Sequence, residues 1–389
     1  MTRTLRNERG MALAIAIFAL VVVGALVAGA FFAGTQEQRV GDNQRRVQQS
    51  FGVAEAGAAE QVRTWNATLM NRRPVYNAAV APTDSVLIGP NLAAPGGTGT
   101  FGGTSYKVGS ALFLIDVTGR DQGSAAGTLG SGNGARQRIG LLTRLDPVNF
   151  NIRASLTTQG TVNVTGNAQV VGVDQNPTGW GNCSGALQNQ AGIRVDSGSV
   201  STGGNGTVAG TPPVVKDTSL SDSSFTNFGG TTYAQLAARA NVTLPGGTYK
   251  TFPTFAGGLC DKANLTNWGD GMNPGTACGD YFPIIHITGS ATLNGDQGQG
   301  ILLVDGNLDV QGSYQFYGIT IIQGELKTAG GGNTEAHFWG GVMAKNATLD
   351  TQNISGKATL NYSSCSLLTV LQATSLTAVM RSRGWAQLY

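Results

Sequence analysis

The sequence predicts a mainly β protein that begins with a long α-helix and continues as a right-handed parallel β-helix, with an antiparallel β-sandwich as the alternative. Three observations support this class. An uncharged apolar run occupies residues 11–34, the rest of the chain is rich in glycine and poor in charge, and short strand–turn–strand units recur from about residue 150 onward. The first observation predicts the helix, and the other two predict a packed β body.

The apolar run from Met11 to Gly34 is long enough to cross a membrane. It contains no charge and no proline, and at about 1.5 Å per residue it spans a hydrocarbon core of about 30 Å. Arg3, Arg6 and Arg9 precede it. An excess of positive charge before the run predicts a cytoplasmic N-terminus, with the body outside the cytoplasm.

Three roles compete for this segment: a cleaved secretory signal, a permanent anchor, or a helix that continues beyond the membrane. Ala28-Gly29-Ala30 is a passable signal cleavage site, but the run exceeds the about 7–15 apolar residues of a signal peptide. Apolar residues also continue to Trp65 with charged residues between them, at the period of an amphipathic helix. We therefore expect one helix over residues 11–65.

The start of this helix resembles a known family. Arg9-Gly10-Met11-Ala12-Leu13, the apolar stretch that follows and VAEAGAAEQVR at 53–63 are similar to the N-terminus of PilX-type minor pilins of type IV pilus systems. The closing RSRGWAQLY at 381–389 resembles the Arg-x-x-x-Trp endings of the same class.

The resemblance implies a processing pathway and a set of partners. Residues 1–10 would be a leader that a prepilin peptidase removes after Gly10, which leaves Met11 as the methylated N-terminus. The helix would sit in the inner membrane and later pack against other pilin subunits, with the inner-membrane assembly machinery as a further partner. The body would then serve assembly, tip display or adhesion at the cell surface, with a surface carbohydrate or host molecule as a candidate ligand.

Small residues within the apolar run predict close helix packing. Gly24 and Ala28 are four residues apart, as are Ala25 and Gly29, and such pairs let helix backbones approach one another in a membrane. The alternative is that small residues are simply frequent in membrane helices. Ile15 stands where the resemblance places the glutamate of major pilins, which predicts a minor, tip-proximal or initiating subunit.

The composition of the body excludes some functions. Glycine accounts for 58 of 389 residues and charged residues for 12 %, while 41 % of residues are apolar, which favours a packed β body over disorder. The net charge is +3, and no basic stripe carries interleaved aromatic residues, so we expect no nucleic-acid partner.

Four cysteines outside the cytoplasm predict disulfides. Three connectivities are possible; we favour Cys260–Cys278, which closes a short loop, and Cys183–Cys365 by elimination. The sequence has no C-x-x-C motif and only two histidines, so we expect no metal and no cofactor.

The remaining chain divides by pattern into three regions. Residues 66–148 are loop-rich with one β-hairpin, residues 149–365 form the predicted β-helix with an insertion near 211–280, and residues 366–389 form a C-terminal cap or tail. Within the body, the second strands of four repeats align at Leu293, Leu308, Leu326 and Leu349. The residues that follow them should form an outward polar ladder of Asn294, Asp309, Lys327 and Asp350.

We do not expect an enzyme. The best acidic group, formed by Asp305, Asp309, Glu325 and Asp350, surrounds Lys327 and has no arginine nearby. His286 lies in an alternating apolar strand, and His337, beside Trp339, suggests a packed turn or a ligand-contacting patch.

The second class of function that fits is an anchored or secreted β-helix protein that binds or processes surface carbohydrate. The segment 270–280 is either a calcium loop or, as we favour, a disulfide-pinned loop.

Overall fold

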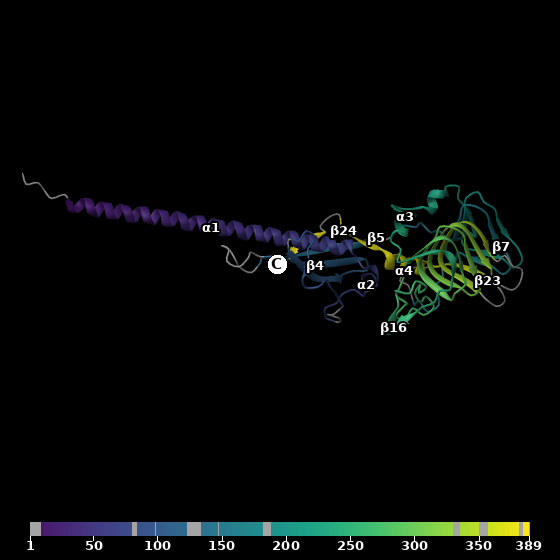
Figure 1. The fold of residues 1–389 in the computed structure, drawn as a ribbon. Helices are drawn as coiled ribbons and strands as arrows, with labels where there is room; N and C mark the ends of the chain where they lie inside the picture. The colour runs from purple at the N-terminus through teal and green to yellow at the C-terminus, as the bar shows by residue number, and fades with distance from the viewer. Residues whose placement is uncertain are drawn as a thin grey trace, which may run out of the picture. The chain divides into compact units, whose positions relative to one another are not determined.

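The computed structural model describes most of the chain and divides it into two compact units. The described residues are 9–79, 84–97, 99–122, 134–146, 148–181, 188–329, 335–349, 357–380 and 384–388. The first unit comprises Met1–Thr64, Val75–Arg144 and Val379–Tyr389, and the second comprises Trp65–Pro74 and Leu145–Ala378. Figure 1 shows the chain coloured from its N-terminus to its C-terminus.

The first unit is a long helix and an antiparallel sheet. Helix α1 spans Arg9–Arg63, within two residues of the predicted bounds. The strands are β1 (Val86–Leu87), β2 (Leu92–Ala93), β3 (Gly99–Lys107), β4 (Leu112–Asp121), β5 (Arg136–Asp146), β24 (Leu376–Val379) and β25 (Trp385–Leu388). Their order is β1-β3-β4-β5-β24, with β2 beside β3 and β25 beside β5. The predicted hairpin is confirmed as β4 and β5, in which Leu112 lies opposite Arg144.

The second unit consists mainly of parallel strands, drawn in teal, green and yellow in Figure 1. The sheet contains β6 (Ala154–Thr158), β7 (Val162–Val164), β8 (Gln169–Val171), β9 (Ala191–Val195), β10 (Val200–Thr202), β11 (Thr207–Ala209), β12 (Val214–Lys216), β15 (Val242–Tyr249), β18 (Ile284–Leu293), β19 (Gln297–Val304), β20 (Leu308–Gln311), β21 (Gln315–Ala329), β22 (Glu335–Leu349) and β23 (Lys357–Tyr362). Its main path is β11-β8-β23-β22-β21-β19-β18-β15.

Shorter elements surround this sheet. They are α2 (Ala67–Met70), the 3₁₀ turn η1 (Asp222–Phe225), β13 (Asn227–Phe228), β14 (Thr231–Thr232), α3 (Tyr233–Ala237), β16 (Phe255–Ala256), β17 (Leu259–Cys260) and α4 (Ser364–Thr374). The strand pairs of the large sheet that the described residues form are all parallel. The antiparallel sandwich is therefore wrong for this part of the chain.

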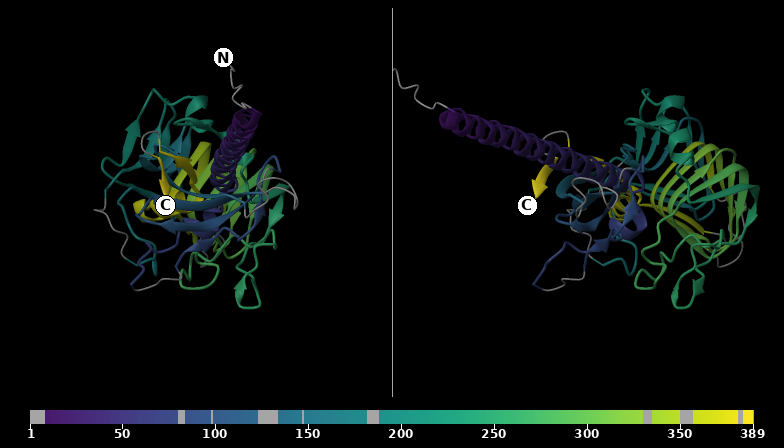
Figure 2. Two further views of the ribbon diagram at one scale, coloured as in Figure 1. Left: turned by 90° about the vertical axis from the view of Figure 1, so that its left-hand side faces the viewer. Right: turned by 60° about the vertical axis from the view of Figure 1, so that its left-hand side comes forward.

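The long strands of this sheet each pair with more than one neighbour. Strand β18 pairs with β19 through Ile284–Ile287 and with β20 through Ala291–Leu293, and both β19 and β20 then pair with β21. These four strands close a ring of parallel pairs. In the right-hand view of Figure 2, the yellow-green strands lie side by side as a curved stack.

The order of the strands in the sheet departs from their order in the sequence. Successive segments of β22 pair with β23, β6 and β7. The strands of residues 154–216 therefore continue the sheet beyond β22. The simple repeat predicted that they would instead stack ahead of the strand that begins at residue 284. The insertion predicted near 211–280 is also partly wrong, because β12 pairs with β9 and β15 pairs with β18 inside the sheet.

The predicted leucine register is correct for one pair and displaced for the others. Leu308 lies beside Leu326, but Leu293 lies beside Val310 and Leu349 beside Thr328. All four leucines are nevertheless fully buried, because a shift of two residues keeps a side chain on the same face of a strand.

The predicted ladder changes with this register. Thr292, Asp309, Lys327 and Thr348 lie in successive strands. Asn294 falls beyond the paired segment, and Asp350 lies outside the described residues. The carboxylate that pairs with the Lys327 ammonium is Glu325, at 3.2 Å, rather than a carboxylate on a neighbouring strand.

The central strands are buried on both faces. Leu302 and Val304 contribute to one apolar cluster, while Ile301 and Leu303 of the same strand contribute to a second. Strands that are covered on both sides consist of continuous apolar residues, which explains the run ILLV at 301–304.

Helix α4 helps to cover the second face, where Val370 packs in the same cluster as Ile319 and Ile321. The predicted C-terminal cap is therefore wrong in its placement, since α4 packs along the strands. The last residues do not cap the body either: in β25, Trp385 lies opposite Leu141 in the first sheet.

A column of glycines marks one bend of the parallel strands. Gly300, Gly318 and Gly340 pair in register, and all three have φ between +112° and +140°. A Cβ atom at Gly318 would overlap the carbonyl oxygen of Gly300, and one at Gly340 would overlap that of Gly318. Only glycine fits both the backbone conformation and the close approach.

Candidate functional site

The apolar part of α1 is exposed along its length in the part of the chain that the structure describes. Its most apolar window has a mean hydropathy of 2.8 and is 0 % buried, and Leu20 and Phe31 are 75 % and 76 % exposed. By length and composition this helix can cross a membrane, although an N-terminal signal sequence would pass the same test. The helix continues without a break to Arg63, well beyond what a signal sequence needs.

The small residues predicted to pack lie within this exposed segment. Gly24, Ala25, Ala28 and Gly29 are all exposed, and a Cβ atom at either glycine would meet nothing within 4 Å. No packing within the described chain therefore requires these glycines. Gly10 and Met11 lie in the α1 backbone, and the Met11 side chain is outside the described part.

The C-terminal half of α1 packs on the first sheet. Val53, Ala54 and Ala58 are buried on one face of the helix. A Cβ atom at Gly57 would lie 2.5 Å from Phe101 of β3, and one at Gly119 of β4 would overlap the helix backbone at Ala54. Glycines on both elements therefore allow the close contact, which sequence periodicity did not reveal.

An aromatic contact joins the helix to the end of the chain. The rings of Phe51 on α1 and Trp385 on β25 meet edge to face, with centroids 5.6 Å apart. Trp385 belongs to the Arg-x-x-x-Trp ending noted in the sequence, so that motif contributes to the packing of the helix.

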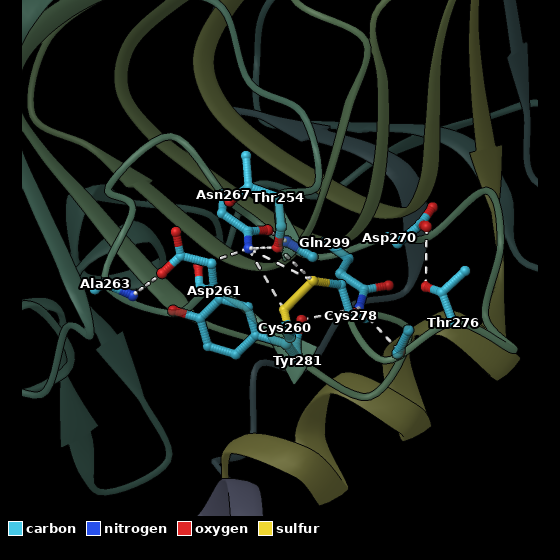
Figure 3. Close-up of a disulfide and its surroundings, with 12 residues drawn as sticks. Thr254, Cys260, Asp261, Ala263, Asn267, Asp270, Thr276, Cys278, Tyr281 and Gln299 are labelled. Atoms are coloured by element: carbon cyan, nitrogen blue, oxygen red, sulfur yellow. Dashed lines mark hydrogen bonds between the residues drawn. A yellow bond between two sulfur atoms is a disulfide. The ribbon is translucent and has the colours of Figure 1, made fainter. Parts of the chain in front are cut away.

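In the second unit, a disulfide holds the loop between β15 and β18. Cys260 and Cys278 are bonded, as the sequence predicts (Figure 3). Beside them, the Asn267 amide donates to the carbonyl oxygens of Thr254 at 3.0 Å and Asp261 at 2.7 Å. Cys365 is buried and is not free, but Cys183 lies outside the described residues, so their pairing stays a prediction.

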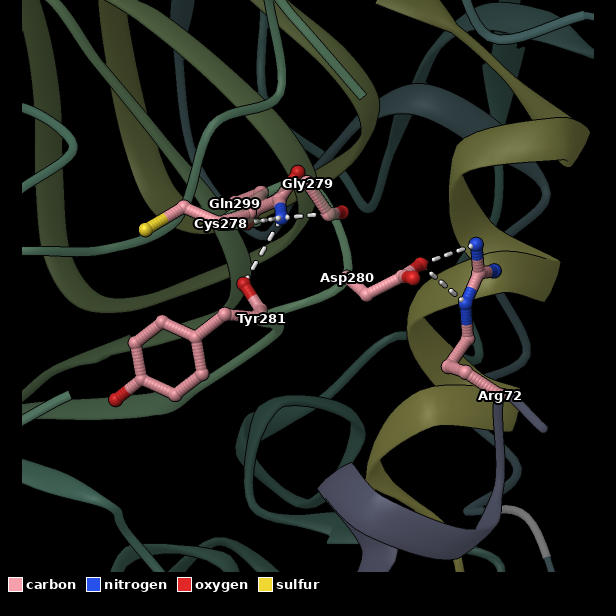
Figure 4. A network of polar contacts seen from close by, with 6 residues as sticks. All are labelled: Arg72, Cys278, Gly279, Asp280, Tyr281 and Gln299. Carbon is pink, nitrogen blue, oxygen red and sulfur yellow. Dashed lines mark hydrogen bonds and ion pairs between the residues drawn. The ribbon is translucent and has the colours of Figure 1, made fainter. Parts of the chain in front are cut away.

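The acidic residues of this loop have partners within the protein. One Asp270 oxygen accepts a hydrogen bond from Gln297 at 2.8 Å, and the other accepts one from Thr276 at 2.9 Å. Asp280 pairs with Arg72 at 2.9 Å, as Figure 4 shows. The Gln299 amide beside them donates to the carbonyl oxygens of Cys278, Gly279 and Tyr281. These contacts favour the pinned loop.

The other polar candidates separate into small clusters. Asp305 accepts a hydrogen bond from Tyr233 at 2.9 Å and lies 3.0 Å from His286 Nε2. Burial, followed by this carboxylate, raises the pKa of the Tyr233 hydroxyl, so that hydroxyl stays protonated and donates. His337 Nε2 lies 3.1 Å from Glu335, and its ring stacks on Trp339.

A pocket of about 710 Å³ lies in the second unit among residues that the sequence did not single out. It contains two arginines, Arg153 and Arg194, together with asparagine and serine side chains from separate loops. Asparagine and serine are common throughout this chain, so only the three-dimensional grouping distinguishes them.

Comparison with known proteins gives little that bears on function. The chain matches no protein-family model and no curated protein. Among solved structures it is similar to the competence-associated pilin ComZ from Thermus thermophilus, with 14 % identity over 88 % of this chain and 98 % of that chain, at a TM-score of 0.26. A likeness at that score does not identify the role of this chain.

Proposed function

We propose that this chain is a non-enzymatic, pilin-like subunit of a type IV pilus or a related pseudopilus, of the PilX-type minor class. The observation that supports it is the unbroken helix α1, which joins an exposed apolar segment to a buried amphipathic one. A cleaved signal sequence would not be continuous with a packed structural helix. A helix that moves from the membrane into a filament needs both properties.

The proposed pathway begins in the inner membrane with the body outside the cytoplasm. Prepilin peptidase removes residues 1–10, and Met11 is methylated. The exposed face with Gly24 and Ala28 then packs against the helices of other pilin subunits. Ile15 lacks the carboxylate that would pair with a neighbour's N-terminal amine, which suits a subunit at the tip or one that starts assembly.

We also infer that the parallel strands form a right-handed β-helix. Support comes from the way the consecutive strands β19 and β20 pair with successive segments of β18 on one side and of β21 on the other, because consecutive segments of one winding would meet consecutive segments of the next. Such a body would display a stiff surface outside the membrane. An experimental structure of the body would show the handedness directly.

Mass spectrometry of the N-terminus of the protein from its native membrane tests the proposed function. We expect the mature natural chain to begin with methylated Met11. In the Gly10→Leu variant, we expect residues 1–10 to remain attached. Gly34→Leu is the matched control and should be processed normally. A chain that begins after Ala30, or a Gly10→Leu protein that matures normally, would show secretion by another route and refute the proposal.

A further inference from the structure

The pocket in the second unit has the volume of a small-molecule site and a mostly polar lining. Its volume of about 710 Å³ lies within the about 300–1,000 Å³ typical of ligand pockets. It opens beside β9 and β22, between the segment that precedes β6 and the segment that follows β12. Its lining residues are Asn149, Phe150, Asn151, Arg153, Arg194, Ser219, Leu220, Ser223, Ser224, Asn227, Gly229, Gly230 and Met343.

Two arginines line the pocket, and a carboxylate compensates the charge of one of them. The Arg194 guanidinium pairs with Asp217, with Nε at 2.8 Å from the carboxylate. Ser219 donates to the other Asp217 oxygen from its hydroxyl at 2.6 Å and from its amide at 3.0 Å. Arg153 is exposed and forms no ion pair or hydrogen bond with the residues that the structure describes. One guanidinium therefore remains available for an anion.

Neutral polar groups line the same space. Asn151 has φ +46°, a left-handed conformation that asparagine tolerates, and its backbone amide bonds to the Asn149 side chain at 3.2 Å. Across the described residues, the side-chain amides of Asn151 and Asn227 have no hydrogen-bond partner, and both residues are exposed at the rim.

The base of the pocket is apolar. Phe150, Leu220 and Met343 line it and are each at least nine-tenths buried. Because Phe150 is 4 % exposed, it offers little ring surface on which a planar base could stack. A ligand here meets a cation, several amides and hydroxyls, and an apolar floor.

We propose that this pocket binds an anionic saccharide, in which a carboxylate on a pyranose ring pairs with Arg153. A guanidinium binds a carboxylate through two parallel hydrogen bonds. The free asparagine amides match ring hydroxyls, which both donate and accept, and the apolar floor matches the C–H face of the ring. The inference concerns the ligand of the body and does not depend on pilus assembly.

Calorimetric titration of the full-length chain in zwitterionic detergent tests this inference, with digalacturonic acid as the probe. We expect saturable binding that is lost for the methyl-esterified disaccharide, which keeps the same rings but has no charge. We expect Arg153→Gln to weaken binding at least tenfold, because it removes the charge and the bidentate contact. Arg136→Gln, an exposed arginine of the first unit, should leave binding unchanged.

A second variant separates loss of binding from loss of folding. Asn151→Gly is compatible with the left-handed backbone and removes the side chain with its amide, so it should weaken binding severalfold without lowering the thermal unfolding temperature. Four outcomes would overturn the inference: no saturable binding to the unmodified chain, equal binding of the methyl ester, inorganic phosphate binding as tightly as the disaccharide, or an equal loss in Arg136→Gln.

Discussion

At the residue scale, the column of glycines in the parallel sheet combines a close backbone contact with a positive φ. We expect Gly318→Ala to lower the free energy of unfolding by about 2–4 kcal/mol, since the new Cβ atom meets the Gly300 carbonyl in a conformation that alanine disfavours. Gly312→Ala is the matched control. Its φ is +75°, but nothing lies within 4 Å, so it should lose only about 1–2 kcal/mol.

Urea unfolding followed by tryptophan fluorescence gives both values, because Trp268 is fully buried in the same core as the parallel strands. Equal losses in Gly318→Ala and Gly312→Ala would contradict the steric part of the argument. They would leave only the backbone conformation to explain why glycine occupies the column.

A single residue, Asp217, also makes the stability of the folded state depend on pH. Hydrogen bonds from Ser219 and then Arg194 lower the pKa of its carboxyl from 3.8 to about 2. A carboxyl whose pKa is lowered by folding stabilises the folded state above its unfolded pKa, and this contribution is lost as the pH falls towards the folded pKa. We expect the unfolding temperature of the natural chain to exceed that of Asp217→Asn by a few degrees at pH 5, and the gap to close between pH 4 and 2.

The control for this titration is Asp146→Asn, since Asp146 is exposed and forms no ion pair among the described residues. Its unfolding temperature should follow that of the natural chain across the same pH range. A gap between Asp217→Asn and the natural chain that persists unchanged at pH 2 would show that the Asp217 charge is not the cause.

At the element scale, the packing of α1 on its sheet requires glycine at a position that faces the sheet, but not at a position that faces away from it. Gly57→Ala should lower the free energy of unfolding of the first unit by about 1–3 kcal/mol, because the new methyl group meets Phe101. Gly52→Ala, in the same helix with nothing within 4 Å, should raise it by about 0.5–1 kcal/mol through better helix propensity. Hydrogen exchange of the α1 amides in detergent measures both changes.

The opposite signs make this pair decisive. If both substitutions stabilised α1 equally, the helix would not be packed on β3 at Gly57. If both destabilised it, the face at Gly52 would be in contact with another surface.

At the scale of the whole molecule, the apolar half of α1 should alone hold the chain in a membrane. Leu20→Arg with Val23→Arg places two charges in the middle of the apolar run, each costing about 2.5–3.5 kcal/mol of insertion free energy. We expect this double variant to move into the soluble fraction on alkaline carbonate extraction. The control, Gln36→Arg with Gln38→Arg, adds the same charges beyond the apolar run and should stay in the membrane fraction. If the Leu20→Arg, Val23→Arg variant also stays in the membrane fraction, another part of the chain provides the attachment.

Local patterns in the sequence determined much of this protein. An uncharged run followed by an amphipathic period defined α1 to within two residues, and alternating apolar residues with turn glycines indicated the hairpin of β4 and β5 and the strands of the body. Cys260 and Cys278 were paired correctly because a short loop separates them. In each case, the residues that determine the element are close together in the sequence or recur at the period of one helix or strand.

Only the tertiary structure decided which distant segments meet. Strand β6 continues the sheet beyond β22, and the Asn71 amide donates to the carbonyl oxygens of Gln372, Ala373 and Ser375 at the end of α4. The pocket with Arg153 likewise combines four separate segments. Side-chain periodicity fixes which face of a strand is buried, but it carries no information on which strand lies beside it, because that choice depends on turn lengths and on packing across the whole core.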